Sequence, residues 1–244
     1  MLMTRTLLLF DIDGTLLTTG GTGMRAMRSV AARLFGPRFN WDGIETGGSL
    51  DPIIFAEAAR RNGISDIETH HLAFRDQYIA QLQRDLPAAA GRIQAMPGVH
   101  ELLDLLRRRR RQQGDIVLGL LTGNYRRVVP LKLQAIGFKT GWFTVEAFGD
   151  EAPTRPDLVR LAIDRYQQQT GHEPERRRVV VIGDTPRDVA CAAAHGCVSF
   201  AVATGQFTHR QLAAAGADHV VEDLTDPGPL VALLDDLVQC QPNA

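Results

Sequence analysis

The sequence predicts an α/β protein: a Rossmann-like, doubly wound parallel sheet core with an inserted helical cap domain. Three observations lead to this fold class. Short, almost wholly apolar runs recur along the chain, as is typical of strands buried on both faces of a parallel sheet. Helical patterns separate the later runs, which gives the βαβ alternation of a doubly wound domain. The stretch between the first two runs is far too long for a simple crossover, and it has helical patterns.

The core is expected at residues 1–17 and 95–244. Its strands are expected at the following apolar runs, the last of which is the weakest: 7–10, 116–121, 179–182, 200–202 and 219–221. Helical patterns follow at 158–166, 189–194 and 230–238. This order predicts parallel strands joined by helices.

The cap is expected at residues 18–94. Apolar residues recur at helical spacing between positions 24 and 34. Asp51 and Pro52 begin a second helix that Gly63 ends, and a third helix is expected over 68–86. Residues 87–98 would then return the chain to the core. An independent helical domain is the alternative, but it would leave the first strand isolated ahead of it.

The overall charge favours neither nucleic acid nor a membrane as a partner. The 244 residues carry 27 basic and 28 acidic side chains, for a net charge of -1. The one basic patch, 107–111, follows apolar residues on an expected helix, and we interpret it as a solvated helix end. The sequence predicts no particular oligomeric state.

The cysteines and the apolar runs indicate a cytoplasmic protein. Cys191, Cys197 and Cys240 are odd in number and form no CxxC pair, so neither a disulfide framework nor a zinc site is expected. The N-terminal apolar run ends at Asp11, too early for a signal peptide, and no run reaches membrane-spanning length.

The first strand ends in two carboxylates, Asp11 and Asp13, followed by Gly14. In open parallel sheets the site lies at the carboxyl ends of the strands. Residues two apart on extended backbone project to one side, and Gly14 permits a sharp turn. Asp11 can therefore serve as nucleophile and metal ligand, with Asp13 as acid and base. A calcium loop also begins Asp-x-Asp-Gly, but it needs further oxygen ligands, which the apolar residues that follow do not supply.

Two later strands also end in groups suited to phosphate chemistry. Thr122, Gly123 and Asn124 offer a hydroxyl, a close backbone approach and an amide, although such a sequence is also an ordinary strand-to-helix turn. Asp184 and Asp188 are four residues apart around the start of a helix, so both can face one cation. N-capping of that helix by Thr185 or Asp184 is also expected there.

Together these motifs resemble the haloacid dehalogenase superfamily. Its pattern is Asp-x-Asp-x-Thr, a Ser or Thr at a strand end, a Lys or Arg, and then Gly-Asp-x-x-x-Asp. The inserted helices and the Met-Pro-Gly-Val segment at 96–99 resemble the phosphoglycolate phosphatase and β-phosphoglucomutase branch. By position, the cation of the third motif is Arg155, which precedes Pro156 and a helix where the family commonly has Lys. Lys132 is the rival.

The resemblance implies a phosphatase that acts on a small phosphorylated metabolite through an aspartyl phosphate on Asp11. Mg²⁺ would be held by the Asp11 and Asp184 carboxylates and the Asp13 carbonyl, with Asp188 in support. Asp13 would protonate the leaving alcohol and then deprotonate the attacking water. The phosphate oxygens would be bound by the remaining motif residues: Thr122, Gly123, Asn124 and Arg155.

Other functions stay open. A phosphomutase would keep all these residues. A metal-independent 2-haloacid dehalogenase is disfavoured by Asp13, and a non-enzymatic binding protein by the intact pair of aspartates. The dinucleotide fingerprint G-x-G-x-x-A at 21–26 begins ten residues after the first strand, too far for that fold, and these glycines are better suited to a cap hinge. The loop 47–51 is expected either to contact substrate or to begin a helix.

Overall fold

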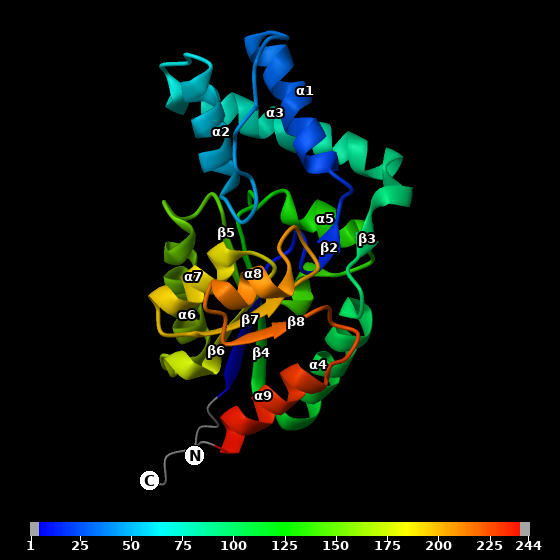
Figure 1. The fold of residues 1–244 in the computed structure, drawn as a ribbon, viewed down its shortest axis with the longest axis vertical. Helices are drawn as coiled ribbons and strands as arrows, with labels where there is room; N and C mark the ends of the chain where they lie inside the picture. The colour runs from blue at the N-terminus through cyan, green and yellow to red at the C-terminus, as the bar shows by residue number, and fades with distance from the viewer. Residues whose placement is uncertain (1–4, 240–244) are drawn as a thin grey trace.

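The computed structural model describes residues 5–239. Cys240 and the outermost residues of the expected core, at both ends of the chain, lie outside this range. Six parallel strands form one sheet in the order β5-β4-β1-β6-β7-β8, and helices cover both of its faces (Figure 1). The strands are β1 (Thr6–Phe10), β4 (Ile116–Thr122), β5 (Val145–Phe148), β6 (Val179–Gly183), β7 (Val198–Val202) and β8 (His219–Val221). The predicted α/β core is therefore confirmed.

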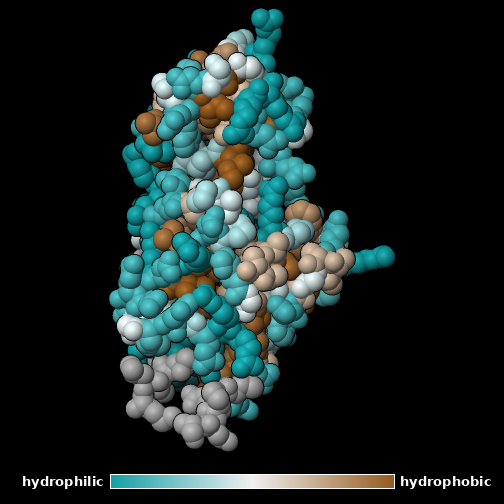
Figure 2. All heavy atoms as spheres, turned by 90° about the vertical axis from the view of Figure 1, so that its left-hand side faces the viewer, coloured by the Kyte–Doolittle hydropathy of each residue, from teal (hydrophilic) through white to brown (hydrophobic). Residues whose placement is uncertain are grey.

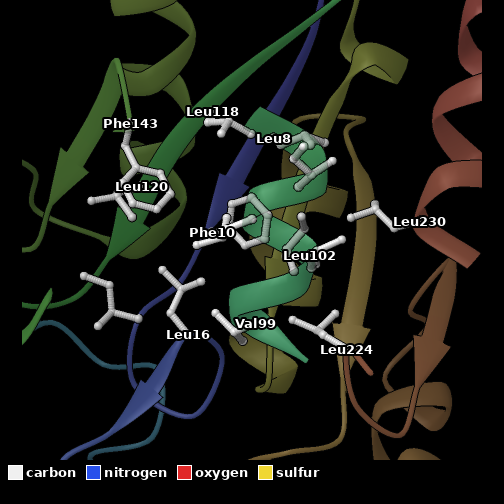
Figure 3. Close-up of a cluster of buried hydrophobic side chains, with 14 of the residues drawn as sticks. Leu8, Phe10, Leu16, Val99, Leu102, Leu118, Leu120, Phe143, Leu224 and Leu230 are labelled. Atoms are coloured by element: carbon white, nitrogen blue, oxygen red, sulfur yellow. The ribbon is translucent and has the colours of Figure 1, made fainter. Parts of the chain in front are cut away.

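Strand β1 lies at the centre of the sheet and is buried along its whole length. Its side chains alternate between two apolar clusters. Leu8 and Phe10 pack with α4 (Val99–Gln113) and α9 (Gly228–Gln239), as Figure 3 shows for part of this cluster. Leu7 and Leu9 pack on the other face with α6 (Arg155–Thr170) and α7 (Pro186–Ala194). Burial on both faces explains why the central strands have continuous apolar sequences.

The register of the central strands brings their carboxyl ends to one edge. Phe10 pairs with Leu120 of β4 and with Ile182 of β6. Asp11, Thr122 and the residues that follow β6 therefore emerge side by side.

Three helices lie beyond this edge, at the top of Figure 1. They are α1 (Thr22–Phe35), α2 (Asp51–Arg61) and α3 (Ile67–Ala88). They enclose an apolar cluster of their own, which includes Phe55 and Phe74, and Tyr125 and Val128 of the core pack against it. Helix α3 continues two residues past the predicted end, through Pro87, and the Ala89 N–H still bonds to the Asp85 and Leu86 carbonyls.

The sequence missed several short elements. Strand β2 (Leu17–Thr18) pairs antiparallel with β3 (Gln94–Ala95) where the chain leaves and re-enters the core. Two residues are too few to show a period. Strand β5 has only four residues, one of them Glu146, and lies at the sheet edge. The remaining missed elements are α5 (Val129–Ala135), α8 (His209–Ala214) and the 3₁₀ turns η1 (Ala90–Arg92), η2 (Thr140–Trp142) and η3 (Arg176–Arg178).

The arginine run at the end of α4 is not simply solvated. Arg109 is 9% exposed and forms ion pairs with Asp115 and Asp235, both at 2.7 Å. Arg107 lies over the Trp142 ring, 3.9 Å from its centroid. The interpretation as a solvated helix end is therefore wrong for these two residues, since both use their charge to attach α4 to its neighbours.

Few large apolar side chains are exposed among residues 5–239. On the face seen in Figure 2, hydrophilic side chains predominate and apolar ones are scattered among them. Among the described residues, the exposed large hydrophobic side chains are Ile53, Leu72 and Val238. No helix within residues 5–239 combines the length and apolar character needed to cross a bilayer.

Candidate active site

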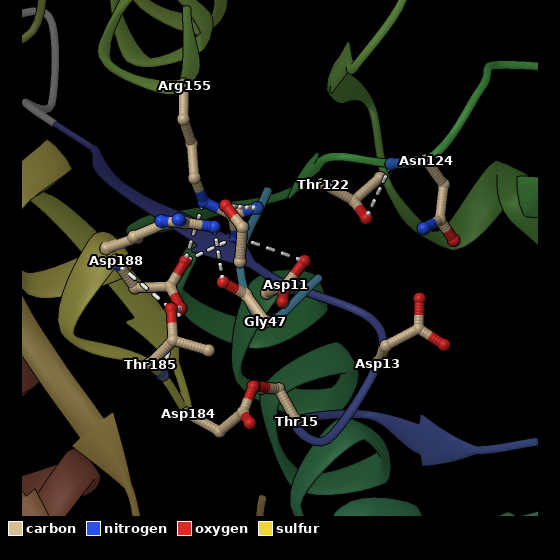
Figure 4. A network of polar contacts seen from close by, with 12 residues as sticks. Asp11, Asp13, Thr15, Gly47, Thr122, Asn124, Arg155, Asp184, Thr185 and Asp188 are labelled. Carbon is tan, nitrogen blue, oxygen red and sulfur yellow. Dashed lines mark hydrogen bonds and ion pairs between the residues drawn. The ribbon is translucent and has the colours of Figure 1, made fainter. Parts of the chain in front are cut away.

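The predicted site residues converge at the carboxyl edge of the sheet. Asp11 follows β1, and its N–H donates to the Ile182 carbonyl of β6 (2.9 Å). Thr122 ends β4, and Asp184 follows β6. All three line one cavity of about 460 Å³, together with Asp13 and Arg155. Figure 4 shows their arrangement.

Asp11 and Asp13 face different cations, although both line the cavity. Asp11 is 5% exposed, and its Oδ1 lies 3.3 Å from Arg155 Nη2. The Asp13 side chain is 42% exposed, and its Oδ2 lies 2.5 Å from Lys132 Nζ. Strand β1 ends at Phe10, so the backbone does not stay extended through both aspartates. The expectation that both carboxylates project to one side is therefore only partly met.

Gly14 turns the chain sharply after these aspartates. Its φ of 84° lies in the left-handed region, and a Cβ there would collide with the Asp184 carboxylate. The next residue, Thr15, donates its Oγ1–H to Asp184 Oδ1 (3.2 Å). The turn therefore brings the first motif into direct contact with the last.

Three buried carboxylates form a cluster that could hold a metal ion. Oxygens of Asp11, Asp184 and Asp188 all lie within 4.8 Å of one another. Burial raises the pKa of Asp11 to about 6, although Arg155 opposes the shift. Burial, with the charges of Asp11 and Asp188, raises the pKa of Asp184 to about 8. Because the site disfavours so much negative charge, an added cation would be strongly attracted. Oxygen ligands of this type suit Mg²⁺.

Both oxygens of Asp188 are held by neighbours. Its Oδ2 accepts hydrogen bonds from the Thr185 N–H (3.1 Å) and hydroxyl (2.6 Å), and Thr185 in turn caps α7 as expected. Its Oδ1 accepts from Arg155 Nη2 (2.5 Å) and Nε (3.2 Å). Asp188 therefore connects the helix start to the cation beside Asp11.

The two candidate cations occupy different places. Arg155 is the first residue of α6 and is 6% exposed, and the charges of Asp188 and Asp11 keep its pKa raised despite burial. Its Nη1 also donates to the Gly48 carbonyl (3.1 Å). Lys132, on α5 (Val129–Ala135), lies beside Asp13 instead. Of the two, Arg155 is the one placed beside Asp11.

The turn after β4 presents polar groups to the cavity. Thr122 is fully buried, and its Oγ1 accepts from the Asn124 N–H (3.4 Å). A Cβ on Gly123 would collide with the Ser49 carbonyl, so only glycine fits there. Within residues 5–239, the buried Asn124 Oδ1 has no hydrogen-bond partner. A bound ligand could satisfy that oxygen.

The loop 47–51 lines the cavity and begins α2, so the expected helix start is found and the expected substrate contact stays a prediction. The Asp51 N–H donates to the Gly123 carbonyl (2.7 Å), and Asp51 Oδ2 accepts from the Tyr125 N–H (2.9 Å). Arg187 Nη1 donates to the Gly47 carbonyl (2.8 Å). Burial raises the pKa of Asp51 to about 7, and Lys132 opposes the shift.

Sequence reasoning missed the part of the cavity that follows β7. Thr204 and Gly205, just after β7, line the cavity, and Thr204 Oγ1 donates to the Gly14 carbonyl (2.6 Å). The strand-end rule would have found them had it been applied to β7. The glycines at 21–26 lie at the start of α1, after β2 and outside the six-stranded sheet.

The parallel sheet therefore carries aspartates at the carboxyl ends of β1 and β6, as the sequence motifs predicted. A model of the haloacid dehalogenase-like hydrolase family matches residues 8–193. The chain therefore belongs to that family.

An individual relative indicates which kind of enzyme in the family the chain is. The chain is 30% identical over 221 residues to a phosphoglycolate phosphatase from Synechococcus elongatus, covering 90% of this chain and 93% of the relative. By this relationship the chain is an enzyme, a phosphatase of the family.

Solved structures share the fold. The crystal structure of CbbY from Rhodobacter sphaeroides in complex with phosphate is 24% identical, with a TM-score of 0.71 over 95% of this chain and 99% of that one. A β-phosphoglucomutase from Clostridium difficile is 13% identical, with a TM-score of 0.70 over 96% and 99%. At such identities the likeness concerns the fold alone.

Proposed function

We propose that the chain is a magnesium-dependent phosphatase that hydrolyses a small phosphorylated metabolite through an aspartyl phosphate on Asp11. One observation carries the proposal. Asp11 is buried at the cavity wall beside Arg155, within 4.8 Å of the Asp184 and Asp188 oxygens. A nucleophile, a cation and a site for a metal ion therefore adjoin one another.

The carboxylates of Asp11, Asp184 and Asp188 would hold Mg²⁺, with the Asp13 carbonyl. The raised pKa values of Asp11 and Asp184 support this proposal, because a bound cation would favour the charged form of both carboxyl groups. When bound, the ion supplies charge neutralisation, so that a phosphate dianion can approach the carboxylates.

The residues of the chain bind the phosphate and supply the nucleophile. Arg155, Thr122 and the backbone amides of Gly123 and Asn124 bind the phosphate oxygens, where charge spreads in the transition state. An Asp11 oxygen forms a bond to phosphorus as the ester P–O bond breaks. The electron pair of the broken P–O bond goes to the leaving oxygen.

Asp13 serves both half-reactions. In the first, it donates a proton to the leaving alcohol. In the second, it removes a proton from the water that cleaves the aspartyl phosphate. Asp13 suits this exchange because its side chain is 42% exposed to the cavity and solvent, whereas Asp11 is buried.

We further propose that residues 18–94 act as a cap on the core of 1–17 and 95–244. The loop 47–51 supports this role because its backbone bonds to Arg155, Arg187 and Gly123 across the cavity. A closed loop would exclude bulk water during phosphoryl transfer.

The substrate would be a small phosphate monoester, because the cavity encloses about 460 Å³. Phosphoglycolate, named for the relative from Synechococcus elongatus, is the first candidate. A cytoplasmic location is supported by Cys191 and Cys197, which are both buried and free.

Phosphate release from a panel of phosphorylated metabolites, with Mg²⁺ and with chelator, tests the proposal. We expect release that requires Mg²⁺ and multiple turnovers. Isomerised phosphate ester without net release would indicate a phosphomutase instead. Halide release from 2-haloacids in chelator would indicate a dehalogenase, and binding without turnover a non-enzymatic protein.

A further inference from the structure

Lys132 is a buried cation that the mechanism above leaves without a role. It lies on α5 at 3% exposure, and its Nζ is 2.5 Å from Asp13 Oδ2. The other lysine of the chain, Lys139, is exposed. Burying an ammonium has a desolvation cost, so its position calls for a physical reason.

Stability alone is a poor reason for the contact with Asp13. The partner side chain, Asp13, is 42% exposed, so water reaches that carboxylate and screens the pair. Removing Lys132 alone would leave the buried Asp51 carboxyl group without this counter-charge, whereas the Asp13 carboxylate would stay hydrated. Lys132 therefore has a structural role toward Asp51, and its contact with Asp13 calls for a separate reason.

The geometry suggests a division between two cations. Arg155 contacts Asp11 and Asp188, whereas Lys132 contacts Asp13. Opposite charges at these distances attract strongly in a partly buried setting. Each aspartate of the first motif is therefore held toward a different side, as the separate directions of Asp11 and Asp13 in Figure 4 show.

The surroundings of Lys132 suggest what the position of Asp13 serves. A second cavity of about 210 Å³ is lined by Lys132, Asp13, Asp51 and Asn124, and it shares Asp13 and Asn124 with the main cavity. Residues of α1, α2 and α3 line the rest of this second cavity. Asp13 therefore lies between the main cavity and a smaller space on the side of these three helices.

We propose that Lys132 is a positioning residue that holds the Asp13 carboxyl group on the leaving-group side, away from Asp11. The inference rests on the proposed function. In the transfer step, the Asp13 O–H bond breaks and its proton goes to the leaving oxygen, which takes the electron pair of the P–O bond. Lys132 keeps its protons and transfers none.

Leaving groups of different basicity test this role. 4-Nitrophenolate is weakly basic and leaves without a proton, whereas phenolate from phenyl phosphate needs one. We expect Lys132→Met to lower kcat/KM for phenyl phosphate by about 10- to 100-fold, less than the roughly 10²–10⁴-fold of general acid catalysis because Asp13 itself remains. The loss for 4-nitrophenyl phosphate should stay within about threefold. The ratio kcat/KM excludes the later hydrolysis of the aspartyl phosphate, which is common to both esters.

Controls separate positioning from damage to the fold. Lys139→Met should match the wild type on both esters. In an Asp13→Asn background, Lys132→Met should cost nothing further, because it acts through Asp13. Lys132→Gln, which keeps a donor but no charge, should show the same dependence on the leaving group if the methionine variant folds poorly.

Equal losses on both esters, or an additive loss in the double variant, would overturn the positioning role while the proposed function stands. Failure of the wild type to hydrolyse either ester in Mg²⁺ would instead remove the proposed function, and this inference with it.

Discussion

Replacing Arg155 by alanine removes the one cation that contacts Asp11 within residues 5–239. Its Nη2 lies 3.3 Å from Asp11 Oδ1 and 2.5 Å from Asp188 Oδ1, and its Nη1 bonds to the Gly48 carbonyl. Without it, three buried carboxylates face one another. Breaking a buried pair costs about 3–5 kcal/mol of stability. Protonation of Asp11 and Asp184, whose pKa values are already raised, should reduce this cost.

Arg155→Ala should also lower kcat strongly, even where the variant stays folded. Removing one donor that stabilises developing charge lowers kcat by about 10²–10³, or about 2.7–4 kcal/mol. Arg155→Lys should recover only part of this, because one ammonium cannot reach Asp11, Asp188 and Gly48 together. Mg²⁺ should raise the unfolding temperature of Arg155→Ala more than that of the wild type, since the ion becomes the main counter-charge.

The assay is steady-state hydrolysis of 4-nitrophenyl phosphate in saturating Mg²⁺, with thermal unfolding measured in parallel. Arg160→Ala, an exposed arginine on the same helix, is the matched control and should behave as wild type. A folded Arg155→Ala with kcat within about threefold of wild type would refute the reasoning. If Lys132→Met then lost activity on every ester, the cation of the third motif would be Lys132.

Three further predictions use the acidic cluster. Asp11→Asn should fold normally yet lose several orders of magnitude in phosphate release; near-normal turnover by pure protein would contradict the nucleophile. Chelation should abolish turnover and Mg²⁺ restore it, and a titration should show Asp184→Ala impaired more than Asp188→Ala, whereas full activity in excess chelator would argue for a metal-free hydrolase. Without metal, thermal stability should fall as pH rises from about 4 to 8. In that range folded Asp11 and Asp184 keep protons that the unfolded chain, with a pKa near 3.8, has released. Mg²⁺ should flatten this slope, and a metal-free stability that rises across the range would exclude the raised pKa values.

The central strands could be predicted because strands buried on both faces have consecutive apolar residues. Strand β1 is buried at every position, and after Thr6 its residues 7–10 are all apolar. Strand β5 escaped because it is short, lies at the edge and includes Glu146. The ribbon of β2 and β3 joins residues about 78 positions apart, and two-residue strands carry no local signal.

Some residues of the candidate site could likewise be predicted from the sequence, and others could not. Asp11, Thr122 and Asp184 follow apolar runs, and a parallel sheet necessarily brings such strand ends together. The partners of the two cations could not be found by this means. Lys132 and Asp13 are 119 positions apart, and Arg155 and Asp188 are 33 apart. Their pairing depends on where α5 and α6 pack, which is a property of the whole core.

The contacts of the loop 47–51 also determine how much free energy it would cost to open the site. Four hydrogen bonds join this loop to the core, from Arg155 to Gly48, Arg187 to Gly47, Asp51 to Gly123 and Tyr125 to Asp51. At a net 0.5–1.5 kcal/mol for each, opening would cost about 2–6 kcal/mol. A cost of this size would keep the loop mostly closed and leave a small open population at equilibrium. Since Gly48 bonds to the same guanidinium that contacts Asp11, closing the loop would also complete the surroundings of the nucleophile.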